Sequence, residues 1–171
     1  MGLLAAIWFI LPAYVANGGA CAIHNTKPVD GGRLAWDGRR IVGDGVTYGG
    51  FLAGTSLAMA MSLVQFLLAP EFFPMADASY ADALLLGFLL GFGALFGDMT
   101  ESFFKRRMGI ARGRPLPLLD QWDFLIGALV FASIIYIPSV TDIVILFVLT
   151  PLIHYGTNVM SNKVGLKDVP W

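Results

Sequence analysis

The sequence has 171 residues, of which 57% are hydrophobic and only 13% are charged. A soluble domain carries about 25% charged residues, so this composition and the mean hydropathy of +0.72 exclude an ordinary soluble protein and indicate an integral membrane protein. The net charge of −1 identifies no partner by itself. Cys21 is the single cysteine, which excludes an intrachain disulfide and a zinc site built from cysteines.

Five apolar segments approach the roughly 20 residues that a membrane-spanning helix needs. They predict an all-α, polytopic membrane protein whose spans are residues 3–23, 49–69, 80–97, 122–138 and 141–160. The whole chain, 1–171, then forms a single transmembrane domain with two long polar loops, at about 24–48 and 98–121. Glycines at four-residue spacing in the second and third segments predict close packing between these helices.

The positive charges predict the orientation of the chain. With five spans, all 11 Lys and Arg residues fall on one side of the membrane. The other side carries Glu71, Asp77 and Asp142 but no Lys or Arg. By the positive-inside rule, both long loops and the C-terminus are cytoplasmic and the N-terminus is outside. We therefore expect a multi-pass protein of the cell membrane with a functional site that faces the cytoplasm.

The start of the second long loop concentrates the chemistry of the chain. If this stretch is helical, one face carries four polar residues: Asp98, Glu101, Ser102 and Lys105. Carboxylates are hard oxygen ligands that suit Mg²⁺, and Lys105, Arg106 and Arg107 can bind phosphate. The same loop closes on Asp120 and Asp123, for which capping of the next helix is an alternative role.

A glycine-rich segment ends the first long loop, where Gly43, Asp44 and Gly45 follow Arg39 and Arg40. Glycine lets backbone N–H groups approach a ligand closely, and the segment runs into a helix N-terminus, which favours anions. It lacks the Gly-Lys-Ser/Thr ending of a Walker A loop. A nucleotide-phosphate site and a plain glycine-rich turn both remain open.

Three polar residues lie at membrane depth: Asn17, His154 and Asn158. His154 and Asn158 are four residues apart near the end of the last span, and hydrogen bonding between helices would account for these two. The alternative is that they line a site, because polar groups inside a membrane often mark one.

The polar motifs resemble those of a known family. The run Gly-Asp-Met-Thr-Glu-Ser-Phe-Phe-Lys-Arg at 97–106, followed by Asp-Gln-Trp-Asp at 120–123, is similar to the signature of the CTP:phosphatidate cytidylyltransferase (CDP-diacylglycerol synthase) family. The short chain and the Asp-Gly-Arg-Arg-Ile-Val-Gly-Asp-Gly loop resemble the archaeal branch, CDP-archaeol synthase, most. The chain departs from the family pattern where Gln121 replaces an arginine and Val46 replaces a lysine.

This resemblance implies a membrane enzyme of phospholipid biosynthesis. Such an enzyme transfers CMP from CTP to a lipid phosphate, here 2,3-bis-O-geranylgeranylglycerol 1-phosphate, and yields CDP-archaeol and pyrophosphate. The implied cofactor is Mg²⁺, held by Asp98, Asp120 and Asp123, with Lys105 as a further catalytic residue. The implied nucleotide- and phosphate-binding residues are Arg39, Arg40, Gly43, Asp44, Gly45, Thr47, Glu101, Ser102 and Arg106.

The expected partners are CTP, the lipid phosphate and membrane lipids, with no nucleic acid. The sequence leaves the oligomeric state and the type of lipid chain open. Two other functions are alternatives. A CDP-alcohol phosphotransferase would need Ala-Arg where Ile41 and Val42 stand. A small transporter would use Asp98 and His154 inside the bundle.

Overall fold

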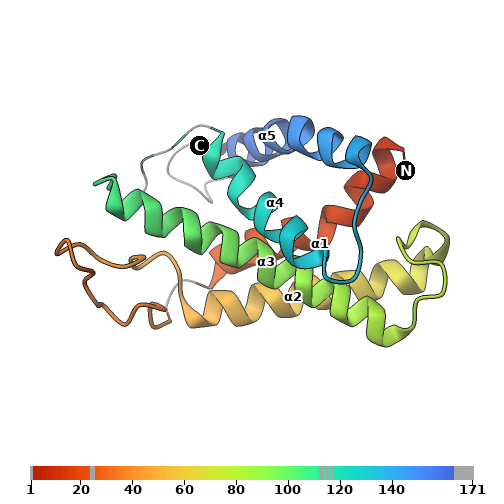
Figure 1. Cartoon of the computed structure of the whole chain (residues 1–171), viewed down its shortest axis with the longest axis horizontal. Helices are drawn as coiled ribbons and strands as arrows, with labels where there is room; N and C mark the ends of the chain where they lie inside the picture. The colour runs from red at the N-terminus through yellow and green to blue at the C-terminus, as the bar shows by residue number, and fades with distance from the viewer. Residues whose placement is uncertain (1, 24–25, 112–113, 115, 117, 164–171) are drawn as a thin grey trace.

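The computed structural model describes residues 2–23, 26–111, 114, 116 and 118–163 and consists of helices (Figure 1). These are α1 (Leu3–Ala22), α2 (Tyr48–Leu68), α3 (Tyr80–Arg107), α4 (Leu119–Ala132) and α5 (Val140–Lys163), with a short 3-10 helix, η1 (Pro70–Phe72), after α2. The predicted all-α fold with five helices is confirmed. α3 is the central helix and packs against α1, α2 and α4.

Among the described residues, α1, α2 and α3 are long and apolar enough to cross a membrane. α4 has 14 residues, which at 1.5 Å per residue is about 21 Å and falls short of the roughly 30 Å of a hydrocarbon core. α5 has 24 residues, of which the described stretch Val140–Ile153 is apolar. Among the described residues, three of the five expected spans are therefore both long and apolar enough to cross a membrane.

The expected span 122–138 was too long at its end. α4 stops at Ala132, and the Ser133 hydroxyl donates to the Val130 carbonyl oxygen at 2.6 Å. The remaining apolar residues form a turn and extended chain ahead of Pro138. Proline cannot donate a backbone hydrogen bond and disfavours helix in the residue before it, so hydropathy alone overestimated this helix.

The expected loop 98–121 is instead helical as far as Arg107. α3 ends where Gly109 adopts a φ of +75°, a left-handed conformation that glycine tolerates. The Ile110 N–H then donates to the Lys105 carbonyl oxygen at 3.0 Å, which completes a Schellman cap. The acidic and basic residues of this stretch are therefore carried on a rigid helix.

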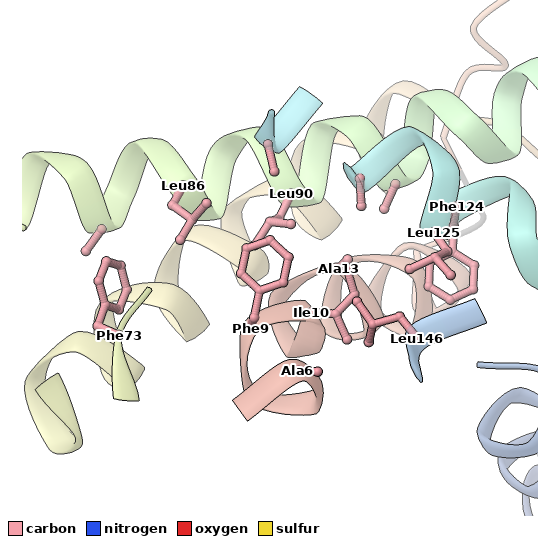
Figure 2. Packing of buried hydrophobic residues seen from close by; sticks show 14 residues of the cluster. Ala6, Phe9, Ile10, Ala13, Phe73, Leu86, Leu90, Phe124, Leu125 and Leu146 are labelled. Atoms are coloured by element: carbon pink, nitrogen blue, oxygen red, sulfur yellow. The ribbon is translucent and has the colours of Figure 1, made fainter. Parts of the chain in front are cut away.

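Buried apolar side chains from four helices form the core of the bundle (Figure 2). Phe9 and Ile10 of α1 meet Leu90 of α3, and Phe124 of α4 and Leu146 of α5 close the cluster. The relative exposure of each of these five side chains is 3% or less. This core fixes how α3 and α4 lie against α1.

Glycines set the closest helix approaches, as predicted. A Cβ at Gly54 would stand 2.7 Å from the Ala16 carbonyl oxygen, and one at Gly87 would stand 2.7 Å from Met59 Cα. These contacts are shorter than real Cβ atoms tolerate, so any larger residue would push α2 away from its neighbours. The prediction that these small residues serve helix packing is confirmed.

The two regions expected as polar loops, at about 24–48 and 98–121, lie at the same end of the bundle. Figure 1 shows segment 26–47, the C-terminal end of α3 and the start of α4 together, with the N-terminus of the chain and segment 69–79 at the opposite end. This arrangement brings the glycine-rich segment next to the polar end of α3.

Candidate active site

α3 and α4 bring three carboxylates together: Asp98, Glu101 and Asp123 each offer a ligand oxygen, and these oxygens all lie within 4.8 Å of one another. Asp98 and Glu101 are three residues apart on α3 and so share a face. Asp123 comes from α4, which can lie this close because residue 97 is glycine. A Cβ there would collide with the Asp123 carbonyl oxygen.

The same helix crossing is made by two further glycines. A Cβ at Gly93 would stand 2.5 Å from the Gly127 carbonyl oxygen, and one at Gly127 would stand 2.9 Å from Gly97 Cα. The backbones of α3 and α4 therefore touch without intervening side chains. The position of Asp123 beside Asp98 is a consequence of this contact.

Lys105 lies one turn beyond Glu101 and joins two acids. Its Nζ is 2.8 Å from Glu101 Oε1 and 2.8 Å from Asp120 Oδ1, and its side chain is only 11% exposed. Both Asp120 oxygens also accept the Leu116 N–H at 3.1 Å. Asp120 thus ties the start of α4 to α3 through the lysine.

The electrostatics of this group favour a cation. The Lys105 ammonium contacts two of the four neighbouring acids but offsets only one negative charge, and the three clustered carboxylates repel one another. An octahedral Mg²⁺ keeps its ligand atoms about 3–4.2 Å apart at metal–oxygen distances of about 2.1 Å. The 4.8 Å spread of Asp98, Glu101 and Asp123 is slightly wider, so small side-chain rotations would let these residues hold such an ion.

Segment 26–47, called the loop below, includes the glycine-rich segment and is organised around the buried carboxylate of Asp30. It accepts hydrogen bonds from the backbone N–H groups of Gly32 at 3.0 Å, Val42 at 3.1 Å and Gly43 at 2.9 Å. Arg40 adds an ion pair at 2.7 Å. Burial alone would raise the pKa of Asp30, but these hydrogen bonds outweigh it and hold the pKa well below its usual range.

Arg107 attaches this segment to the end of α3. Its guanidinium pairs with Asp37 at 2.8 Å and donates to the carbonyl oxygens of Arg39 and Arg40. It also lies 5.3 Å from the ring centroid of Trp36 and 5.2 Å from that of Phe103. Arg39 in turn binds α3, because its guanidinium donates to the Arg107 carbonyl oxygen at 2.8 Å.

Thr47 ends the segment and starts α2. Its hydroxyl oxygen accepts the Gly50 N–H at 3.1 Å and donates to the Ile23 carbonyl oxygen at 3.3 Å. The Gly49 N–H donates to the hydroxyl of Thr26 at 3.0 Å. The first turn of α2 is thus capped by side chains of the protein.

A pocket of about 90 Å³ connects the segment with the carboxylates. Asp98 of α3, Gly45 and Thr47 of the loop, and Asn17 of α1 all line it. Its other lining residues are Ala20, Cys21, Val46, Gly50, Phe51 and Leu95. A ligand in this pocket would contact both the glycine-rich segment and one member of the three-carboxylate group.

The chain was compared with known proteins. The model of the CarS-like family, described as CDP-archaeol synthase, matches residues 2–171. Curated proteins named CDP-archaeol synthase are 46% identical over 169 residues in Thermococcus onnurineus, covering 99% of this chain and 97% of the relative, and 43% identical over 172 residues in Methanocaldococcus jannaschii, with the same coverage. This chain belongs to the CarS-like CDP-archaeol synthase family. The resemblance seen in the motifs is confirmed.

A solved structure described as an intramembrane enzyme for archaeal membrane lipids biosynthesis has the same fold. It is 36% identical, its TM-score is 0.80, and the match covers 92% of this chain and 95% of that one. The helix arrangement of that enzyme therefore holds for most of this chain.

Several residues expected from the CarS-like resemblance do lie together. Asp98, Glu101 and Asp123 form the cluster, with Lys105 and Asp120 beside it. Asp120 pairs with the lysine, and Glu101 takes the third place in the group of possible ligands. Neither acid of α4 caps that helix. The N-cap residue of α4 is Leu118, and its backbone N–H donates to Gln121 Oε1 at 2.7 Å.

Other expected residues contact the protein itself. Arg40 pairs with Asp30 and Asp44, and Arg39 caps α3. Arg106 lies beside the loop, with its Nε 3.9 Å from the place of a Cβ at Gly43. Two more positions add little polar contact: Ser102 is half-buried on α3, and Val46 is 6% exposed and lines the pocket.

Two residues that build the site were not predicted from the sequence. They are Asp30, which organises the loop, and Gly127, whose lack of a side chain lets α3 approach α4. An acid ten residues before an arginine carries no recognisable signal, and the partner of a packing glycine is set by tertiary contact. The intramembrane amide of Asn17 was noticed but not placed. The side chains of His154 and Asn158 lie outside the described residues.

Proposed function

We propose that this chain is a membrane cytidylyltransferase that transfers CMP from CTP to a lipid phosphate. The acceptor is 2,3-bis-O-geranylgeranylglycerol 1-phosphate, and the products are CDP-archaeol and pyrophosphate. The observation that carries this proposal is a pocket that is lined both by Asp98 of the carboxylate cluster and by Gly45 and Thr47 of the loop. The CDP-archaeol synthases to which the chain is similar support the identity of the substrates.

Mg²⁺ fits the three-carboxylate group, with Asp98, Glu101 and Asp123 as its holders and Asp120 beside them. When bound, the ion neutralises phosphate charge and lowers the barrier to attack at the α-phosphorus. We expected Asp120 among the ligands. Its ion pair with Lys105 instead favours a supporting role for Asp120, in which it positions the lysine.

The residues of the chain position two anions. Both reactants enter already ionised, so the acceptor phosphate attacks without a general base, and the bond between the α-phosphorus and the bridging oxygen breaks as pyrophosphate leaves. Lys105 and Arg106 supply positive charge along α3. The loop holds the nucleotide through Gly43, Gly45 and Thr47, with Ser102 nearby. Arg39, Arg40 and Asp44 shape that loop through their contacts within the protein.

The orientation belongs to the same proposal. Five membrane crossings, with the N-terminus outside and the C-terminus inside, place the loop and the end of α3 in the cytoplasm, where CTP is available. The lipid phosphate reaches the same surface from the bilayer. In a Cys21→Ser background, a membrane-impermeant maleimide should label Asp77→Cys on intact cells, and Gly31→Cys only after permeabilisation. The reverse pattern would contradict the proposal.

The enzymatic test uses the purified protein in lipid nanodiscs with α-³²P-labelled CTP, Mg²⁺ and the ether-linked lipid phosphate. We expect a labelled CDP-lipid, no product with EDTA, and recovery when Mg²⁺ is restored. An ester-linked phosphatidic acid, tested in parallel, reports the preference for lipid chains. A folded protein that forms no CDP-lipid from either acceptor would refute the proposal, and product formed only from a CDP-lipid and an alcohol would indicate a phosphotransferase.

A further inference from the structure

Asn17 stands apart from the other side chains of α1. Residues around it on the helix are apolar or small, and it lies five residues before the last residue of α1, Ala22, or about 7.5 Å along the axis. The side chain is half-buried and lines the pocket together with Asp98 and Thr47. The amide therefore faces the space that the carboxylate cluster also faces.

Other polar side chains inside the bundle are satisfied by the protein. The Tyr14 hydroxyl bonds the Thr150 hydroxyl at 2.8 Å, and Gln65 Nε2 donates to the Trp8 carbonyl oxygen at 2.6 Å. In the described part of the chain, the Asn17 amide has no such partner, and only its backbone carbonyl accepts a bond, from Cys21 Sγ. Because Asn17 is half-buried and lines the pocket, its amide is available to a ligand bound there, and a polar side chain inside a membrane protein often marks a site.

The residues that line the pocket limit which chemical group of a ligand the Asn17 amide can bind. Asp98 brings negative charge to one wall, so an anionic ligand is held there only through a cation. The walls formed by Ala20, Phe51 and Leu95 offer no side-chain donor. Phosphate oxygens that point away from the cation therefore need a donor from another wall. A neutral amide supplies it without competing with the cation for Asp98.

We propose that Asn17 is a substrate-binding residue whose amide N–H donates to a non-bridging oxygen of a reacting phosphate. This inference deepens the proposed function and rests on it. Two reactants carry the same chemistry, the nucleotide and the lipid phosphate, and both meet at the carboxylate cluster. The experiment separates them.

The test compares Asn17→Ala and Asn17→Asp with the wild-type protein in nanodiscs. Loss of a hydrogen bond to a charged group corresponds to an effect of about tenfold to a hundredfold, so Asn17→Ala should reduce kcat/KM by that factor. Asn17→Asp keeps the shape but turns a donor into an acceptor with negative charge, and should reduce it further. Binding of CTP with Mg²⁺, measured by calorimetry without lipid acceptor, identifies the source: weaker binding assigns the nucleotide phosphate, and unchanged binding with a raised KM for the lipid assigns the lipid phosphate.

Gly18→Ala is the matched control, because position 18 is exposed and a Cβ there meets no atom within 4 Å. It should behave as wild type. Rates are normalised to the folded fraction from size-exclusion chromatography, and if Asn17→Asp does not fold, the uncharged Asn17→Ala decides alone. Wild-type kinetic constants and CTP binding in folded Asn17→Ala would overturn the role of Asn17 while wild-type turnover still upheld the proposed function. An inactive wild-type protein would instead remove the function itself.

Discussion

Arg107 is the strongest single connection between the glycine-rich segment and α3, so its replacement tests whether docking of that segment serves CTP binding. Arg107→Ala removes an ion pair to Asp37, two hydrogen bonds to loop carbonyl oxygens, and stacking on Trp36 and Phe103. None of these groups belongs to the carboxylate cluster. The change therefore loosens the loop and leaves the cluster intact.

The free energy of loop docking that Arg107→Ala removes follows from these contacts. The ion pair joins side chains that are 13% and 25% exposed, so it contributes about 1 kcal/mol at most. A hydrogen bond from a charged donor is worth about 1.5–3 kcal/mol, and each aromatic contact adds about 0.5–1 kcal/mol. The contributions are not additive, and we take about 3 kcal/mol for the whole.

A loss of about 3 kcal/mol changes the docked-to-undocked ratio of the loop about 150-fold, since about 1.4 kcal/mol corresponds to tenfold. If only the docked loop binds CTP, KM for CTP rises by up to that factor and kcat recovers at saturating CTP. Arg107→Lys keeps a charge for Asp37 but loses the planar stacking and the paired carbonyl contacts. It should raise KM by about tenfold.

Steady-state kinetics across CTP concentrations give KM and kcat, and hydrogen exchange of segment 30–46 reports docking directly. In Arg107→Ala, exchange in this segment should accelerate while exchange in the middle of α3 stays protected. A variant with lowered kcat, unchanged KM and unchanged exchange would refute the reasoning. In that case Arg107 would act on the reacting groups and not through the loop.

Three further predictions concern the cluster and the loop. Asp123→Asn should lower kcat by about a hundredfold or more at saturating Mg²⁺, because it removes a charge from the cation site, with an almost unchanged melting temperature; near-normal turnover would assign the site to the other acids. Gly97→Ala should push α4 away, costing about 1–3 kcal/mol in thermal unfolding and raising the Mg²⁺ concentration needed for half-maximal activity, and an unchanged Mg²⁺ requirement would contradict it. Because the pKa of Asp30 is lowered in the folded protein, its contribution to loop docking should be complete above the ordinary value of about 3.9 and lost only as the pH falls through the lower, folded-state value. The protection factors of the loop amides, which correct for the intrinsic pH dependence of exchange, should therefore stay high at pH 4 in wild type. In Asp30→Asn they should already be low at neutral pH. Equal protection factors in the two proteins at neutral pH would exclude this role.

The helices were predictable where hydropathy and helix ends coincide. α1 and α2 begin and end within about a residue of the expected spans, because polar or capping residues such as Thr47 flank their apolar runs. The ends of α3 and α4 were not predictable in this way. α3 continues through charged residues until Gly109 stops it, and α4 stops inside an apolar run. Hydropathy indicates whether a segment prefers an apolar environment to water, whereas capping interactions determine where a helix ends.

The site was predictable to the extent that it follows helical spacing. Asp98 and Glu101 meet because they are three residues apart on α3. Which acid of α4 joins them depends on the crossing at Gly97 and Gly127, a tertiary contact that no local pattern encodes. Asp123 faces the cluster and Asp120 faces Lys105 for that reason.

The arginines show why charge alone does not identify a phosphate site. Arg40 and Arg107 are paired with the loop acids Asp30 and Asp37, and Arg39 binds carbonyl oxygens at the end of α3. Their guanidinium groups are used to hold the loop, so they offer an anionic substrate less than their number in the sequence suggests.

Arg106 differs from Arg40 and Arg107 because it makes no ion pair with an acid among the described residues. One of its terminal nitrogens donates to the Ile110 carbonyl oxygen at 2.8 Å. Its buried Nε, like that of Arg107, has no hydrogen-bond acceptor among the described residues, and it lies beside Gly43. A buried donor of this kind is costly unless a ligand completes it. Arg40 and Arg107 are already paired with acids, and the Lys105 ammonium is shared by Glu101 and Asp120. Neutralisation of the substrate phosphates therefore depends on Arg106, on the remaining charge of Lys105 and, above all, on the divalent cation that the carboxylates hold. This dependence is the physical reason why the clustered acids, and not the more numerous bases, are the feature around which a reaction between two anions must be organised.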